Sequence, residues 1–229
     1  MVGKIRGFKD YDSLSDWLYE EFRKRYNQRA RFQRPFKVGF SGGTSPVGLW
    51  DRMVWSGADW QYLEIFFVDE RAVKPDEELS NFKLLKDRLI EPAGINLSQI
   101  HRIRGELGAE PASRQYNELL KRLIIPSGLD LIVAGIGEDG HVASIFPLSP
   151  VIKDRENLAL ASYDGPLVPR ITFTLKTFRL AREVFLILAG KKKRDALKKI
   201  LDERTDTAQC PAKAVLELGN SIVLTTELS

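Results

Sequence analysis

The segment "GIGEDGHVASIFP", residues 135–147, holds one of only two histidines in the chain. His141 follows Asp139 by two residues and is flanked by Gly137 and Gly140. A neighbouring carboxylate can orient an imidazole and stabilise the cation that forms when the ring takes a proton. We expect "HVASIF" to begin a helix, whose N-terminus would keep the ring neutral at rest. Although a lone histidine is more often structural, this pattern predicts that His141 is a general base.

Other kinds of catalytic site are less well supported by the sequence. Ser144 and Ser149 lie in no nucleophile elbow, which argues against a Ser-His-Asp hydrolase. Two histidines and a single cysteine, Cys210, argue against a catalytic zinc and exclude an intrachain disulfide. We expect Cys210 to be a buried or incidental thiol, and His101, which has no glycine or carboxylate context, to be structural.

The stretch "SGGTSP", residues 41–46, joins an apolar run, "FKVGF", to a segment with helical spacing, "VGLWDRMVW". Gly42 and Gly43 let the backbone approach a ligand closely, and the free amides at a helix start favour phosphate. Thr44 adds a hydroxyl. The stretch matches neither the Walker loop nor the dinucleotide pattern. Alone it leaves two interpretations open, an anion-binding loop and a purely structural turn.

Charged residues follow two further apolar strands. In "LEIFFVDERAV", Asp69, Glu70 and Arg71 come directly after the strand, where they are either solvated or aimed into a ligand crevice. In "AGKKKRDALKKILDE", Lys193 lies four residues before Leu197, on the stripe that we expect to be buried. A lysine in the first turn of a helix opposes the helix dipole, which predicts a nearby anion, either a ligand or an acidic side chain. That buried stripe is expected to consist of Leu197, Ile200 and Leu201.

These segments repeat one pattern, an apolar strand, a glycine turn and a helix. Strands that alternate with helices and are apolar throughout predict an α/β fold, a single domain over residues 1–229 with a mainly parallel, Rossmann-like sheet and helices on both faces. Ligands in such sheets bind beyond the carboxyl ends of the strands. The expected strands lie at 36–40, 63–68, 100–103, 129–137, 157–163, 170–178, 183–188 and 221–228, and the expected helices at 14–29, 47–55, 80–90, 111–124 and 191–203.

Composition narrows the class of protein. The 229 residues carry 35 basic and 31 acidic side chains, so charge argues for neither nucleic acid nor a membrane surface as partner. Residues 191–199 are basic, but no aromatic residues are interleaved, so nucleic-acid binding is only a minor interpretation. The N-terminus has no apolar signal region, and no apolar run is long enough to span a membrane. We therefore expect a cytoplasmic location.

The ordered set "FSGGTSP", "FFVDERAV", "SNFKLL", "LDLIVAGIGEDGHVASIFP", "VPRITFT" and "LAGKKKRDAL" resembles the 6-phosphogluconolactonase family. This family shares a superfamily with glucosamine-6-phosphate deaminase, and the resemblance covers roughly residues 36–200. It implies hydrolysis of 6-phospho-D-glucono-1,5-lactone to 6-phosphogluconate in the oxidative pentose phosphate pathway. The resemblance implies a sugar-phosphate lactone as the bound small molecule. It implies no metal or organic cofactor and no obligate protein partner.

Residue roles follow from the same resemblance. It makes His141 the base that activates water, with Asp139 supporting it. The loop of Gly42, Gly43 and Thr44 would surround the substrate phosphate. The remaining implied residues are the cations Arg71, Arg170 and Lys193 around the bound ester, and Asp69 in a supporting or structural part.

Two rival functions share some of these features. The deaminases continue the histidine motif as "GHIAFNEP", with a glutamate that helps to open the sugar ring, whereas the matching residue here is Phe146. Loss of that carboxylate argues against ring opening. A sensor that binds a sugar phosphate without turnover would lack the base, and the presence of His141 in a complete motif argues against it.

Overall fold

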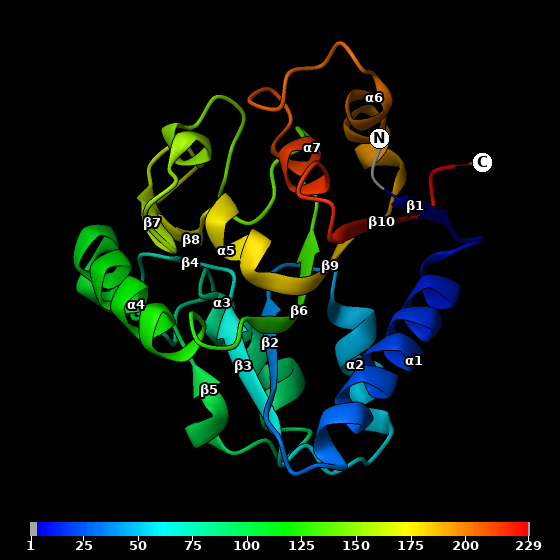
Figure 1. Cartoon of the computed structure of the whole chain (residues 1–229), viewed down its shortest axis with the longest axis vertical. Coiled ribbons are helices and arrows are strands. Elements are labelled where there is room, and N and C mark those ends of the chain that lie inside the picture. Colours follow the sequence, from blue (N-terminus) through cyan, green and yellow to red (C-terminus); the bar gives the residue numbers. More distant parts are fainter. Residues whose placement is uncertain (1–3, 229) are drawn as a thin grey trace.

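A parallel β-sheet runs through the computed structural model, which describes residues 4–228. Its seven strands are arranged in the order β1-β10-β9-β6-β2-β3-β5, and every neighbouring pair is parallel (Figure 1). This confirms the expected α/β fold with a mainly parallel sheet. The strands of this sheet are β1 (Lys4–Gly7), β2 (Phe36–Phe40), β3 (Leu63–Phe67), β5 (Ile100–His101), β6 (Leu129–Gly135), β9 (Ala181–Leu188) and β10 (Ser221–Thr225).

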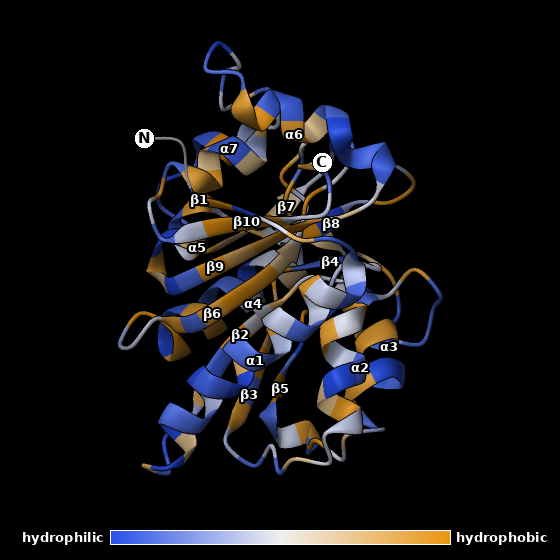
Figure 2. Cartoon of the chain, turned by 90° about the vertical axis from the view of Figure 1, so that its right-hand side faces the viewer, coloured by the Kyte–Doolittle hydropathy of each residue, from blue (hydrophilic) through white to orange (hydrophobic). Residues whose placement is uncertain are grey.

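Helices cover both faces of the sheet. In Figures 1 and 2, α1 and α2 lie side by side on one face, and α4 lies on the opposite one. The helices are α1 (Tyr11–Ala30), α2 (Val47–Trp55), α3 (Asn81–Leu85), α4 (Ala109–Leu123), α5 (Leu175–Leu180), α6 (Arg194–Leu201) and α7 (Pro211–Leu216). Short helical turns are η1 (Lys86–Ile90), η2 (Leu97–Gln99), η3 (Gly105–Leu107), η4 (Pro150–Lys153) and η5 (Lys191–Lys193). No helix in residues 4–228 is long and apolar enough to cross a membrane.

The central strands are buried on both faces, which explains why their sequences are apolar throughout rather than alternating. In β6, every residue from Leu129 to Ala134 is buried, and Figure 2 shows the strands as apolar bands between more polar helices. The one charged residue in this run, Asp130, accepts hydrogen bonds from the Arg29 side chain and the Lys37 backbone. One connected apolar core therefore includes residues from α1, the sheet and α4.

A second, smaller sheet lies beside the first and was not predicted. It is antiparallel, in the order β4-β8-β7, with β4 (Asp69–Arg71), β8 (Arg170–Phe173) and β7 (Ala159–Ser162). Instead of entering a loop after β3, the chain bends at Val68 and continues as β4 in the other sheet. One continuous segment therefore belongs to both sheets, and the charged residues Asp69, Glu70 and Arg71 begin where it passes from the first sheet to the second.

Three local predictions hold only in part. The alternating segment 170–178 is a strand only to Phe173, because Leu175 and Phe178 have helical spacing and are buried in α5. The expected strand at 100–103 is two residues long. In α6, Leu201 is 46% exposed, and Ala196 rather than Leu201 completes the buried stripe with Leu197 and Ile200.

Candidate active site

A cavity opens at the carboxyl ends of β2 and β6, where the second sheet meets the first. Eight of the nine predicted site residues line it, and the ninth, Asp139, lies behind His141. The lining residues are Ser41, Gly42, Gly43, Thr44, Ser45, Asp69, Arg71, Asn81, Gly135, Ile136, Gly137, His141, Ala143, Arg170 and Lys193. The structure therefore brings together every residue that the sequence had marked as a candidate.

The glycine loop leaves β2 and enters α2. The backbone N–H groups of residues 42–45 have no acceptor among residues 4–228, so four donors in succession are free for an anion. Gly43 has a φ of +79°, a conformation that favours glycine. A Cβ on Gly42 would come within 1.9 Å of Asn81 Oδ1, so a residue with a side chain would displace Asn81. The loop combines the two properties that a phosphate cradle needs, free donors and close backbone approach.

His141 and Asp139 form a close pair. His141 Nδ1 lies 2.6 Å from Asp139 Oδ1, and the same oxygen accepts the backbone N–H of His141 at 2.9 Å. Burial would raise the pKa of the Asp139 carboxyl, but these hydrogen bonds outweigh it and leave the pKa below its ordinary value. An ionised carboxylate only accepts hydrogen bonds, so in the neutral imidazole Nδ1 carries the proton and Nε2 the free lone pair.

The predicted helix start at His141 is wrong. Residues 141–146 form tight turns with isolated bridges from Val142 to Ile136 and Ile145. Ala143 has a φ of +55°, which a right-handed helix does not allow. No helix dipole therefore acts on the ring, and its position depends on close packing instead: a Cβ on Gly137 would lie 2.1 Å from the imidazole.

Arg71 and Arg170 lie side by side in the second sheet, as directly paired residues of the neighbouring strands β4 and β8. Arg170 is only 8% exposed, its Nε has no hydrogen-bond partner, and its guanidinium lies 5.3 Å from the ring of Phe146. Phe146 in turn contacts His141, with 4.7 Å between ring centroids. Burial, and then the nearby charge of Arg71, lower the pKa of Arg170. Arg71 is half-buried, and two like charges this close, neither of them in an ion pair within residues 4–228, favour a nearby anion.

Lys193 is the third cation of the cavity. It lies at the turn before α6, and its Nζ donates to Ser45 Oγ at 3.0 Å. Burial lowers the pKa of the Lys193 ammonium, although the nearby Glu138 opposes this. As expected, Lys193 points inward while Lys191 and Lys192 are exposed. Among the residues described, none of Arg71, Arg170 and Lys193 forms an ion pair with a carboxylate.

Glu70, the acidic residue between Asp69 and Arg71, has a structural part. Its carboxylate accepts the backbone N–H groups of Arg71, Asn81 and Phe82 at 2.7–2.8 Å and the Ser80 hydroxyl at 3.1 Å. Burial raises the pKa of Glu70, and these four donors oppose the rise. The carboxylate fixes the start of α3 against β4.

Asn81 is a site residue that sequence reasoning missed, although its "SNF" segment was recognised. Its side chain accepts a hydrogen bond from Arg71, donates to the Asp69 backbone carbonyl at 2.8 Å, and packs on Gly42. Asp69 itself accepts the Ser144 hydroxyl at 2.7 Å. Asn81 therefore joins the glycine loop to the cations, a contact between distant segments that no spacing along the chain reveals.

Free amides, an oriented histidine and unpaired cations at the ends of parallel strands are typical of α/β enzymes that act on small anionic substrates. No group of three or more His, Cys, Asp or Glu side chains suited to a metal is present in residues 4–228. A family model described as glucosamine-6-phosphate isomerases/6-phosphogluconolactonase matches residues 9–224. The chain belongs to this family, which confirms the resemblance and extends it beyond residues 36–200.

Individual relatives agree with this placement. A 6-phosphogluconolactonase of Treponema pallidum is 30% identical over 204 residues, which cover 86% of this chain and 83% of the relative. A solved 6-phosphogluconolactonase from Thermotoga maritima has a TM-score of 0.81 and 26% identity, covering 97% of this chain and 98% of that one. A solved monomeric glucosamine-6-phosphate deaminase, at 20% identity, has a TM-score of 0.83 over 97% and 96% of the two chains. The fold alone therefore does not separate the two activities.

Proposed function

We propose that this protein is a 6-phosphogluconolactonase, which hydrolyses 6-phospho-D-glucono-1,5-lactone to 6-phosphogluconate with His141 as the base. The observation that carries the proposal is the Asp139–His141 pair beside a cavity with three unpaired cations. The family membership and the Treponema relative support the same activity. The packing of Phe146 between His141 and Arg170 favours hydrolysis over deamination, since no carboxylate stands there to assist ring opening.

The proposed reaction uses His141 in two steps. Nε2 takes a proton from a water molecule as the water oxygen attacks the lactone carbonyl carbon. The tetrahedral oxyanion then collapses, the bond from the carbonyl carbon to the ring oxygen breaks, and the imidazolium returns the proton to that oxygen. Asp139 holds Nδ1–H throughout and stabilises the transient cation. No proton acceptor beyond this pair is needed until the product acid ionises.

We assign the two ends of the substrate to two sides of the cavity. The free amides of the glycine loop, residues 42–45, bind the phosphate together with Arg71 and Lys193, because both cations lie beside this loop. Arg170 stabilises the developing oxyanion, because it lies on the same side of the cavity as His141: its guanidinium lies over Phe146, and Phe146 contacts His141. Asp69 supports this arrangement through Ser144 and Asn81.

The direct test follows freshly generated 6-phosphogluconolactone by proton release at constant pH, with the spontaneous rate subtracted. We expect rapid, enzyme-dependent ring opening with no added metal and no loss of rate after treatment with a chelator. Glucosamine 6-phosphate is offered in parallel and ammonia is measured. Ammonia release without lactone hydrolysis would refute the proposal and favour the deaminase.

The substitution Lys193→Ala tests the phosphate assignment. We expect KM for the phosphorylated lactone to rise about tenfold or more, because one charge-assisted hydrogen bond contributes about 1.5–3 kcal/mol. Hydrolysis of the unphosphorylated glucono-1,5-lactone should change little. Exposed Lys192 offers a matched control as Lys192→Ala. An equal loss on both lactones would show that Lys193 does not act on the phosphate.

A further inference from the structure

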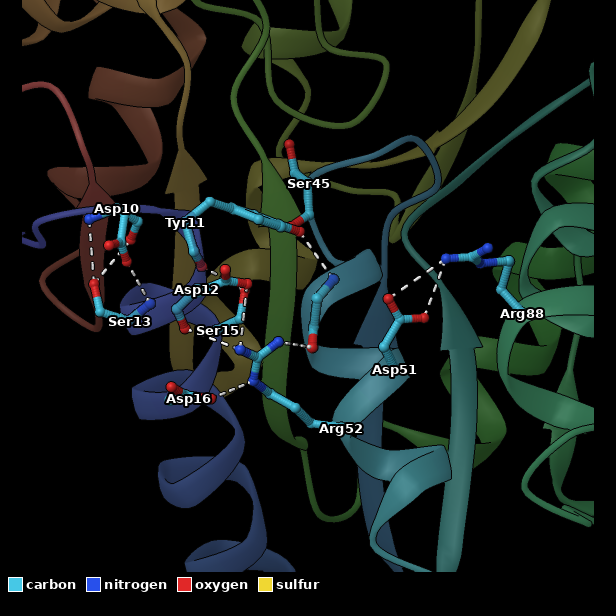
Figure 3. A network of polar contacts seen from close by, with 11 residues as sticks. Asp10, Tyr11, Asp12, Ser13, Ser15, Asp16, Ser45, Asp51, Arg52 and Arg88 are labelled. Atoms are coloured by element: carbon cyan, nitrogen blue, oxygen red, sulfur yellow. Dashed lines mark hydrogen bonds and ion pairs between the residues drawn. The ribbon is translucent and has the colours of Figure 1, made fainter.

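Tyr11 reaches the glycine loop from outside the cavity. It is the first residue of α1, and it is not among the residues that line the pocket. Its hydroxyl lies 2.8 Å from the carbonyl oxygen of Ser45 (Figure 3). The same hydroxyl lies 3.1 Å from the carbonyl oxygen of Thr44 and accepts the backbone N–H of Gly48 at 2.9 Å. One phenol oxygen thus contacts the backbone of Thr44, Ser45 and Gly48, which belong to the turn between β2 and α2 and to the first turn of α2.

These contacts determine where the loop amides point. In a trans peptide the C=O and the following N–H point in opposite directions. The Thr44 carbonyl faces Tyr11, so the N–H of Ser45 is directed away from Tyr11, and Ser45 is one of the residues that line the cavity. This N–H is one of the four free donors.

Tyr11 also completes the start of α2. The residue at the N-cap position, Pro46, offers no side-chain hydrogen bond to the helix. The phenol oxygen of Tyr11 supplies an acceptor for Gly48 N–H instead, from a different helix. The junction between the glycine loop and α2 is therefore fixed through α1.

The sequence around Tyr11 holds its side chain in place. Asp10 and Ser13 form a capping box, which starts α1 directly at Tyr11. A Cβ on Gly48 would lie 2.2 Å from Ser15 Oγ, so the glycine allows the two helices to approach this closely. Figure 3 also shows Arg52 of α2 joined to the first turns of α1; its Nε donates to Asp16 at 2.6 Å.

The same loop residue connects Tyr11 to a cation of the cavity. Ser45 offers its carbonyl to Tyr11 and its hydroxyl to Lys193 Nζ, at 2.8 and 3.0 Å. A shift of the Ser45 backbone would therefore move both a free amide and the partner of the lysine. Few alternative positions exist, since Ser45 Oγ packs against Gly135, where a Cβ would approach it to 2.7 Å.

We propose that Tyr11 is a positioning residue that gives the site its preference for a phosphorylated substrate. It acts by holding the Ser45 amide of the glycine loop and, through Ser45, the Lys193 ammonium. This inference rests on the proposed function insofar as the loop binds phosphate. It assigns Tyr11 no contact with the substrate.

The test compares Tyr11→Phe with Tyr26→Phe. Tyr26 lies on the same helix and makes an equivalent bridge, donating to the Asp59 carbonyl at 2.8 Å and accepting Tyr62 N–H at 3.3 Å, far from the cavity. Both variants lose one hydroxyl of this kind, so both should lower Tm by a few degrees. Binding of inorganic phosphate is measured by calorimetry, and kcat and KM are measured on the phosphorylated and unphosphorylated lactones.

We expect Tyr11→Phe to weaken phosphate binding and to raise KM for the phosphorylated lactone about tenfold, with kcat changed less than about threefold. The unphosphorylated lactone should react as with the wild type, and Tyr26→Phe should leave all these constants unchanged. Equal effects of the two variants, or an unchanged phosphate affinity in Tyr11→Phe, would overturn the inference. A failure of the proposed function is seen separately, as a wild-type protein that does not hydrolyse the lactone.

Discussion

Replacing His141 by Asn is expected to lower kcat for the phosphorylated lactone by about 10²–10⁴-fold, the usual contribution of a positioned general base. The Asn amide can still donate to Asp139 from near the position of Nδ1, but it has no basic nitrogen at the position of Nε2. The substitution therefore removes the base and keeps the contact that orients it. Steady-state kinetics across a range of pH, with the spontaneous hydrolysis subtracted, measure the loss.

The other histidine supplies the control. His101 stacks on Phe66 at 4.4 Å between ring centroids and lies 3.5 Å from Glu64, outside the cavity. His101→Gln should leave kcat unchanged. Phosphate binding should be intact in His141→Asn, since the glycine loop and cations are untouched. A kcat within threefold of the wild type in His141→Asn would contradict the proposed mechanism.

The parts of the site that could be predicted share one physical origin. Parallel strands end at a common edge, so the polar residues after β2, β3 and β6 converge whatever the length of chain between them. For the same reason the glycine loop and His141 meet in one cavity although nearly a hundred residues separate them. Helical phase likewise sufficed to single out Lys193 from its neighbours.

The parts that could not be predicted depend on contacts across the fold. The turn after His141 requires a left-handed Ala143, and "HVASIF" contains no glycine or proline that would signal such a turn locally. Asn81 and Tyr11 act through the backbone of residues 42–48, which only tertiary packing brings near them. The location in the cell and the roles of the individual site residues stay predictions.

Arg170→Met is expected to make the protein more stable and less active. Burial and Arg71 both lower the pKa of Arg170, and the charge of Asp69 opposes them only in part, so folding disfavours the charged form of this guanidinium. Removing the charge should stabilise the fold by about 1–3 kcal/mol, seen as a rise in Tm of several degrees. Met keeps an apolar contact with Phe146, where the guanidinium now lies.

The same substitution should lower kcat/KM by about 10²–10³-fold, because a donor to the developing oxyanion is lost. Exposed Arg179→Met is the matched control and should change neither stability nor activity. Added phosphate should raise Tm of the wild type, since an anion bound among the cations offsets their repulsion. This rise should be preserved in Arg170→Met, because the phosphate is assigned to the glycine loop, Arg71 and Lys193. A variant that loses both stability and activity would instead make Arg170 a structural residue, and the destabilisation that we attribute to its unpaired charge would be wrong.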